Sequence, residues 1–348
     1  AYLFVGPIGS GKTEAAVALA QALLCKDGGC GSCDDCLRVS RRTHPDLHIV
    51  EPLGAGGYLV DQMHALIHDA SLAPMRSSHK IYLITRADLL RGHAANAFLK
   101  TLEEPTASVV FILLARTRES VFEETLLSRC LVVSFRAVPE IEAIHILTKD
   151  GHILERDARV ALASTGGSVL RAREFLGSST HRALRLAVLE TIEQLTESDA
   201  LDVIRAALDL TVALKAPLDE VKAEQERQLE EAKDFFTKGA LSTLEQRHKQ
   251  ALTARTREML GETFNIMRSW LRDCLLVRIG HAADMVNTDF HYNIEKTAAL
   301  TLESAFVRSL AAVDEAQEHI TYNVSPQSTL ESLLLTIRDE LTIKEAYV

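Results

Sequence analysis

The chain has 348 residues, 47% of them hydrophobic, which is enough apolar material for the cores of two or three domains. Its 38 basic and 48 acidic residues give a formal net charge of −10, which argues against a protein that binds DNA mainly through its own positive charge. No apolar run approaches the roughly 20 residues of a membrane helix and no signal-peptide pattern is present, so we expect no membrane association.

A phosphate-binding loop follows residues 2–5, a short apolar run that we expect to form a strand. The loop matches the spacing G-x-x-x-x-G-K-T and consists of Gly6, Pro7, Ile8, Gly9, Ser10, Gly11, Lys12 and Thr13. In such loops backbone N–H groups cradle phosphate oxygens, the lysine reaches the β and γ phosphates, and the threonine hydroxyl ligates Mg²⁺. An Ala/Leu-rich helix over residues 14–24 completes the strand–loop–helix order, so we predict binding of ATP or ADP with Mg²⁺. The alternative is a chance Gly-rich turn. Because the chain begins inside the first strand, we expect an N-terminal segment to be missing.

The strand that should complete an ATPase site lacks the acidic residues that hydrolysis needs. In P-loop ATPases an acidic residue at the end of a second apolar strand holds Mg²⁺, and a neighbouring carboxylate orients the attacking water. Here the candidate strand, residues 80–84, is followed by Thr85 and Arg86. Threonine carries no charge for the metal, and arginine stays protonated and cannot act as a base. Asp88 lies too far past the strand to replace them. The sequence therefore predicts weak or absent intrinsic ATPase activity.

Four of the six cysteines fall within twelve residues, with glycines between them: Cys25, Cys30, Cys33 and Cys36. Four thiolates in a closed shell are typical of structural Zn²⁺. Two alternatives stay open, namely two disulfides, which a chain with a nucleotide loop and no export signal disfavours, and an iron–sulfur cluster. We predict a structural zinc module over residues 25–36. Cys274 occupies an apolar helical position and is expected in a core.

Strands and helices alternate through the rest of the first region. Expected strands cover residues 47–50, 80–84, 109–114 and 131–135, and expected helices cover residues 60–72, 93–104 and 125–129. This alternation predicts an α/β P-loop core over residues 1–137 with a parallel, doubly wound sheet and the nucleotide at the carboxyl ends of its strands.

Only helices are expected after residue 137. Residues 138–179 read as a small helical lid with helices over 141–147, 155–164 and 169–176, and residues 180–348 read as an all-α collar. Two apolar stripes mark its first helices: Leu184, Ala187, Val188, Thr191, Ile192 and Leu195, and then Leu201, Ile204, Leu208 and Val212. Charges of both signs alternate over about 219–258, which predicts an exposed helical extension, with a coiled-coil partner surface as the alternative. Trp270 is expected in the core.

Several of these motifs together resemble those of the bacterial clamp-loader AAA+ subunits, the delta-prime and gamma/tau subunits of DNA polymerase III. The motifs that carry the resemblance are residues 6–13, the four cysteines, His44-Pro45-Asp46-Leu47, residues 94–105, Ser128-Arg129-Cys130, and Asn323-Val324-Ser325-Pro326-Gln327 with the leucine-rich residues 330–334. They occur in the order and at the intervals of that family. The resemblance covers the first 180 residues well and returns near the end of the chain.

The resemblance implies an AAA+ core, a helical lid, and a collar that joins a hetero-pentameric ring with delta and gamma/tau subunits. In the cytoplasm such a ring loads the sliding clamp onto primer-template DNA, and its subunits are grouped with DNA-directed DNA polymerase, a nucleotidyltransferase. Arg129 corresponds to the arginine that reaches a neighbour's ATP, against a surface salt bridge as the plain alternative. Arg171 resembles the lid arginine placed over the phosphates, against a solvated helix charge.

Thr85 and Arg86 in place of the acidic pair favour a delta-prime-type subunit, because gamma/tau subunits are the motors of the family. An active gamma/tau-type ATPase is the alternative within the family. Outside it, a P-loop small-molecule kinase would need an acceptor pocket and phosphate-clamping arginines, and a scaffold would bind no nucleotide at all.

Overall fold

The computed structural model describes residues 1–7, 9–53, 57–118, 121, 124–233, 238–319 and 325–342. The chain divides into two compact units, Ala1–Pro139 and Glu140–Val348. The finer division of the second unit into a lid and a collar stays a prediction. No helix within the described residues is long and apolar enough to span a lipid bilayer.

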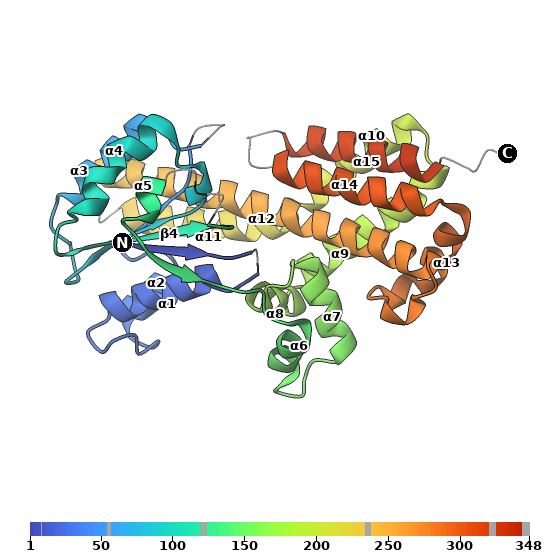
Figure 1. Ribbon diagram of the computed structural model, residues 1–348, viewed down its shortest axis with the longest axis horizontal. Coiled ribbons are helices and arrows are strands. Elements are labelled where there is room, and N and C mark those ends of the chain that lie inside the picture. The colour runs from blue at the N-terminus through green and yellow to red at the C-terminus, as the bar shows by residue number, and fades with distance from the viewer. Residues whose placement is uncertain are drawn as a thin grey trace. The chain divides into compact units, whose positions relative to one another are not determined.

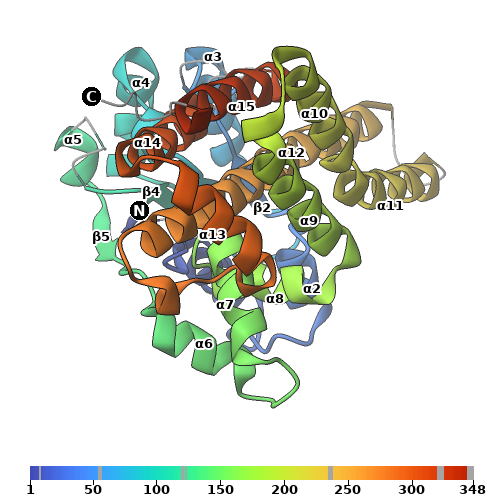
Figure 2. The same ribbon diagram turned by 90° about the vertical axis from the view of Figure 1, so that its right-hand side faces the viewer.

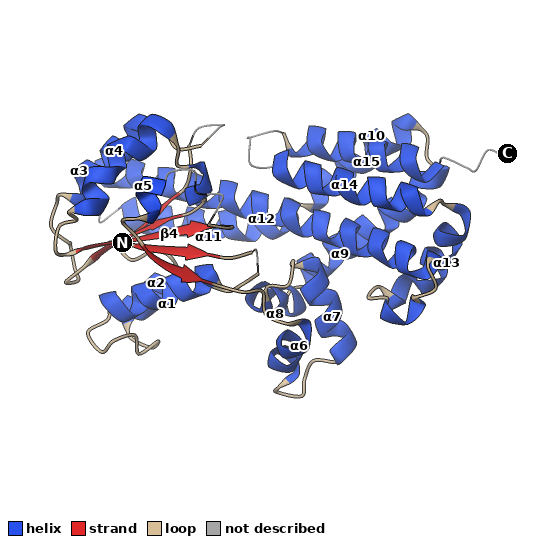
Figure 3. Cartoon of the chain, viewed as in Figure 1, coloured by secondary structure: helices blue, strands red, loops and turns tan. Residues whose placement is uncertain are grey.

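The first unit is built on a five-stranded parallel sheet (Figure 3). Its strands are β1 (Tyr2–Val5), β2 (Leu47–Val50), β3 (Lys80–Ile84), β4 (Val109–Ala115) and β5 (Leu131–Ser134), in the spatial order β2-β3-β4-β1-β5. Every pairing within the sheet is parallel. The predicted parallel α/β core is therefore confirmed, and each strand boundary lies within one residue of its expected place.

Helices cover both faces of this sheet (Figure 1). The helices of the unit are α1 (Lys12–Leu24), α2 (Asp34–Ser40), α3 (Val60–Ala70), α4 (Gly92–Glu103) and the short α5 (Glu124–Leu127), with a 3-10 turn η1 (Ala87–Leu89). Neighbouring strand residues point to opposite faces. Accordingly, Phe4 packs with Ala16 of α1, whereas Leu3 belongs to the cluster that contains Phe98 of α4. These two apolar layers hold the sheet edges, and thus the candidate sites, in fixed positions.

The described residues of the second unit form helices and no strand. The α-helices are α6 (Glu140–Thr148), α7 (Glu155–Ser164), α8 (Val169–Gly177), α9 (Ser179–Gln194), α10 (Ala200–Ala213), α11 (Ala216–Lys233), α12 (Lys238–Arg278), α13 (His291–Leu300), α14 (Glu303–His319) and α15 (Pro326–Thr342). Three 3-10 turns lie between them: η2 (Leu195–Glu197), η3 (Ala282–Asp284) and η4 (Thr288–Phe290). Helices α9, α13 and α14 pack against α12 (Figure 2). Trp270 and Cys274 of α12 are fully buried, as predicted.

Helix α10 is apolar on two faces. Val203, Ala207 and Leu210 are buried in the core of the unit. The stripe that the sequence marked, Leu201, Ile204, Leu208 and Val212, is instead exposed, at 42% to 58% of each residue's surface. The core stripe lies two or three residues further along the helix, so an apolar period alone did not identify the face that packs.

The predicted charged extension corresponds to α11 and the first half of α12. These two helices pack on one another, and Gln225 Nε2 donates a hydrogen bond to the carbonyl of His248 at 3.3 Å. Residues 234–237 between them lie outside the described residues.

Candidate functional site

The phosphate-binding loop joins β1 to α1 at the carboxyl edge of the sheet. Gly9 and Gly11 adopt φ of 80° and 78°, left-handed values that favour glycine. Gly6 lies against β5 so closely that an added Cβ would stand 2.7 Å from the carbonyl oxygen of Phe135. The three glycines of the predicted motif are thus each required by the backbone. Ile8, which the motif also includes, lies outside the described residues.

The polar groups of this loop fit a phosphate. Helix α1 starts at Lys12, and its N-cap, Gly11, provides no side chain to accept the first N–H groups, which leaves them for an anion. The Ser10 hydroxyl is buried and has no hydrogen-bond partner among the described residues. Lys12 Nζ donates to the carbonyl of Pro7 at 3.0 Å and so folds back over the loop. Thr13, the predicted Mg²⁺ ligand, occupies the second position of the helix.

The two positions that directly follow β3, Thr85 and Arg86, carry no acidic side chain for a magnesium site. The Thr85 hydroxyl donates to the carbonyl of Val50 at 3.3 Å. Arg86 takes a left-handed backbone conformation with φ of 53°, uncommon for a residue with a side chain, and its Nη2 donates to Asp88 Oδ2 at 3.1 Å. Asp88 itself is buried. Asp88 Oδ2 is therefore already paired with an arginine, while the buried Oδ1 has no hydrogen-bond partner among the described residues.

The four cysteines of the predicted module converge on one point. Their Sγ atoms all lie within 4.8 Å of one another, and Cys25 Sγ stands 3.8 Å from Cys30 Sγ and 3.6 Å from Cys33 Sγ. Four thiolates about 2.3 Å from a tetrahedral Zn²⁺ would be separated by about 3.8 Å. None of these cysteines forms a disulfide. The geometry thus fits a single tetrahedral metal ion.

Burial and hydrogen bonding shift the pKa values of these thiols in opposite directions. Hydrogen bonds to Cys30 from the backbone N–H of Ser32, and then from the backbone N–H of Cys33, lower the pKa of the Cys30 thiol to about 6. Burial raises the pKa of Cys36 to about 12. A buried thiolate at Cys36 needs a compensating positive charge, which a bound metal ion would provide.

The motif of residues 44–47, which follows the cysteines in the sequence, anchors the cysteine module to the sheet. The buried Asp46 carboxylate accepts three backbone N–H groups from residues 75–77, at 2.5 to 2.8 Å. Within that loop the Arg76 side chain donates to Asp34 and Asp35, at 2.8 and 2.6 Å, at the start of α2. Helix α2, which the sequence did not predict, thereby ties the cysteine cluster to the loop before β3.

Arg129 lies between α5 and β5, at the amino edge of the sheet. Its Nε and Nη2 both donate to Glu103 Oε1, and its Nη1 donates to the carbonyl of Thr125 at 2.7 Å and to Ser128 Oγ at 3.3 Å. The side chain is 28% exposed and that of Glu103 43%. Sequence reasoning gave no role to Glu103. Its place at the end of a helix that precedes a parallel strand was the only available signal that it would lie at the same edge as Arg129.

The two edges of the sheet hold different candidate groups. Leu131 follows Arg129 by two residues, and its backbone N–H donates to the carbonyl of Ala1 at 3.0 Å. Arg129 therefore lies near the amino-terminal end of the neighbouring strand β1. The phosphate loop follows the end of β1, about 13 Å away at 3.3 Å per residue. Cys25 follows α1, which runs back from the loop for roughly 20 Å. The structure therefore brings the cysteines and Arg129 to one edge and the phosphate loop to the other.

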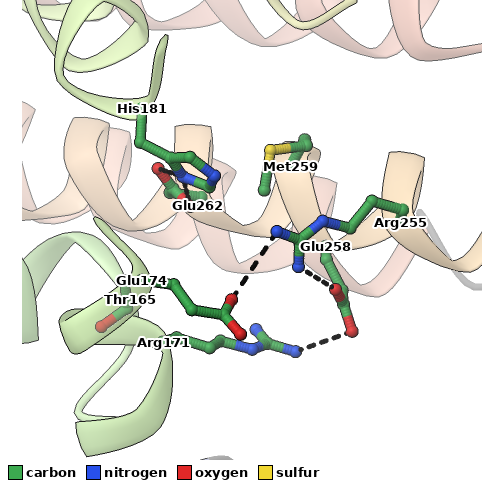
Figure 4. Close-up of a pocket in the computed structure, with 8 residues that line it drawn as sticks. All are labelled: Thr165, Arg171, Glu174, His181, Arg255, Glu258, Met259 and Glu262. Atoms are coloured by element: carbon green, nitrogen blue, oxygen red, sulfur yellow. Dashed lines mark hydrogen bonds and ion pairs between the residues drawn. The ribbon is translucent and has the colours of Figure 1, made fainter. Parts of the chain in front are cut away.

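Arg171 belongs to the second unit, in the first turn of α8, where it lines a small polar pocket (Figure 4). It lies 3.4 Å from Glu258, which also accepts from Arg255 at 2.9 Å, and Arg255 lies 3.6 Å from Glu174. The pocket is further lined by Thr165, His181, Met259 and Glu262. Arg171 thus takes part in an ion-pair network, and 38% of its side chain stays exposed to solvent. Its role over phosphates stays a prediction.

Comparison with known proteins places these features in a family context. A family described as "DNA polymerase III, delta subunit" matches residues 1–139. The DNA polymerase III subunit delta' of Bacillus subtilis is 26% identical over 97% of this chain and 91% of its own length. Subunit delta' of Pseudomonas aeruginosa is 33% identical over 56% of this chain and 61% of its own length. Subunit tau of Salmonella typhimurium is 34% identical over 60% of this chain, which spans only 34% of that relative.

Proposed function

We propose that this chain is a clamp-loader subunit of the DNA polymerase III delta-prime type, and that it supports ATP hydrolysis in a neighbouring subunit while hydrolysing little or no ATP itself. In this proposal it occupies one position of a hetero-pentameric ring with delta and gamma/tau subunits. The ring loads the sliding clamp onto primer-template DNA in the cytoplasm.

The position of Arg129 carries this proposal. The arginine lies at the amino edge of the sheet, while the chain's own phosphate loop lies at the carboxyl edge. A side chain at the amino edge is too distant to contact a nucleotide in the chain's own loop, whereas it is exposed enough to contact another subunit. A guanidinium at a neighbour's γ-phosphate would stabilise the charge that develops there as the phosphoryl group departs.

The chain's own loop is suited to hold nucleotide without turning it over. The glycine conformations, the uncapped start of α1 and the buried hydroxyl of Ser10 together favour a phosphate. Thr85 and Arg86 supply neither a metal ligand nor a base. We therefore propose that ATP or ADP binds with Mg²⁺ coordinated mainly by Thr13 and the phosphates, and that Arg171 assists from the lid.

The cysteine cluster and the collar complete the proposal. Cys25, Cys30, Cys33 and Cys36 would hold a structural Zn²⁺, with no open position for chemistry. The exposed apolar face of α10 would join the collar to another subunit, since a helix that is apolar on both faces is normally covered on both.

The test is an Arg129→Ala variant in the reconstituted clamp-loader complex. Arginines supplied in trans are worth roughly 10³ to 10⁵ in rate at a single site, and the loss in a ring with several sites should be smaller but clear. Arg159→Ala is the matched control, because the Arg159 side chain is also partly exposed, at 42%, and pairs with one carboxylate, Glu155, at 3.1 Å. Equal rates of ATP hydrolysis and clamp loading for Arg129→Ala and the unmodified complex would show that the assignment is wrong.

A further inference from the structure

The guanidinium of Arg129 is nearly saturated with hydrogen bonds in the structure. An arginine side chain has five N–H donors. Among the described residues, Nε donates once and Nη2 once to Glu103 Oε1, and Nη1 donates to both Thr125 O and Ser128 Oγ. Four of the five donors are therefore in use, and one N–H of Nη2 remains.

These acceptors differ in what they belong to. Thr125 and Ser128 lie in the same turn as Arg129, four and one residues away, so they move with it. Glu103 belongs to α4, 26 residues earlier in the chain. It is also the only one of the three that carries a charge. Glu103 is therefore the acceptor that can be left behind when the arginine reorients.

A phosphate needs the edge of the guanidinium that Glu103 occupies. Arginine grips phosphate most strongly through two parallel N–H groups, either Nε with Nη2 or Nη1 with Nη2. Glu103 covers the first of these edges, and the turn of α5 covers half of the second. A two-pronged contact with a phosphate thus requires the Glu103 carboxylate to be released.

We propose that Glu103 is the resting partner of Arg129, which exchanges this carboxylate for the γ-phosphate of ATP in the neighbouring subunit. The inference rests on the trans role of Arg129 proposed above. Because both side chains are partly exposed, the ion pair is weak, and its exchange is readily reversible. Glu103 competes with the phosphate for the same charge, so removing the carboxylate strengthens nucleotide binding next door.

The experiment measures binding of a non-hydrolysable ATP analogue, and the KM for ATP, in the reconstituted complex. We expect Glu103→Gln to lower both the Kd and the KM by about two- to fivefold, the range for a partly exposed ion pair. Glu103→Ala, which also removes the acceptor oxygen, should give an equal or larger shift. Glu104→Gln is the matched control, since Glu104 is the next residue and is also exposed. In an Arg129→Ala background Glu103→Gln should have no effect.

Three results are decisive. If Arg129→Ala slows the complex but Glu103→Gln and Glu103→Ala leave both constants unchanged, the exchange is wrong and the trans role stands. If the Glu103 variants slow hydrolysis as Arg129→Ala does, the carboxylate orients the arginine, and the competition we infer is refuted. If Arg129→Ala itself has no effect, the proposed function fails and the inference fails with it. Melting temperatures of the variant subunits, expected within a degree or two of the unmodified chain, establish that folding is intact.

Discussion

The two edges of the sheet in the first unit carry different groups that could act on ATP. At the carboxyl edge the phosphate loop has the backbone of a binding site, but β3 ends in Thr85 and Arg86. At the amino edge Arg129 is held by three acceptors and retains access to solvent. Under the function proposed above, the subunit would lack hydrolysis at one edge and assist a neighbour at the other, because the two groups lie at opposite ends of the strands.

The largest effect that we predict concerns the rate of ATP hydrolysis by the isolated chain, which tests whether the carboxyl edge is inactive. We expect hydrolysis about 10² to 10³ slower than in a subunit with an acidic pair, because the loss of one preorganised catalytic contact costs that much. The measurement is steady-state ATP hydrolysis by the purified chain, with Lys12→Ala as the control for contaminating activity. Turnover on the order of 1 s⁻¹ that Lys12→Ala abolishes would mean that the carboxyl edge is an active site after all.

A smaller effect concerns the zinc ion that we propose for the cysteine cluster at the amino edge. We expect about one Zn²⁺ per chain. Cys33→Ser should remove most of it and lower the stability by at least about 2 kcal/mol, roughly 5–10 °C in melting temperature, since metal binding contributes to folding. Metal analysis and thermal unfolding with and without a chelator provide the measurement.

Cys130→Ser is the matched control, because Cys130 is a free thiol outside the cluster and should leave the zinc content unchanged. Nucleotide binding at the opposite edge should survive Cys33→Ser if the two edges are independent. A chain without metal that melts at the same temperature with and without chelator would contradict the zinc assignment.

Much of the fold follows from local patterns in the sequence. The central strands β3 and β4 are buried on both faces and read as apolar runs, so their ends were predicted to within one residue. The cysteine cluster and the phosphate loop are contiguous, and each carries its own spacing rule. Helix α2 escaped prediction because it is only seven residues long and overlaps the cysteines.

Contacts between distant segments were not predictable in the same way. Glu103 accepts from Arg129 across 26 residues of sequence, and Arg171 pairs with Glu258 on another helix. Neither pairing produces a local pattern in the sequence. Of the two apolar faces of α10, the sequence marked only the exposed one, and periodicity alone cannot say which of the two faces the core covers.

The smallest effect that we expect concerns association with another subunit through α10. It tests whether ring assembly depends on a surface other than the two sheet edges. Ile204 is 42% exposed on α10, so Ile204→Glu removes no core contact and should change the chain's own stability by no more than about 0.5 kcal/mol. If another subunit covers this face, the buried charge should weaken the association by about tenfold, or about 1.4 kcal/mol. Leu154→Glu is the control, since Leu154 is also an exposed apolar residue, at 58%, and lies at the N-cap of α7 and not on α10. Equal affinities of the two variants and the unmodified chain for the partner subunits would show that this face is not part of the ring, whereas a selective loss for Ile204→Glu would separate assembly from the roles of both sheet edges.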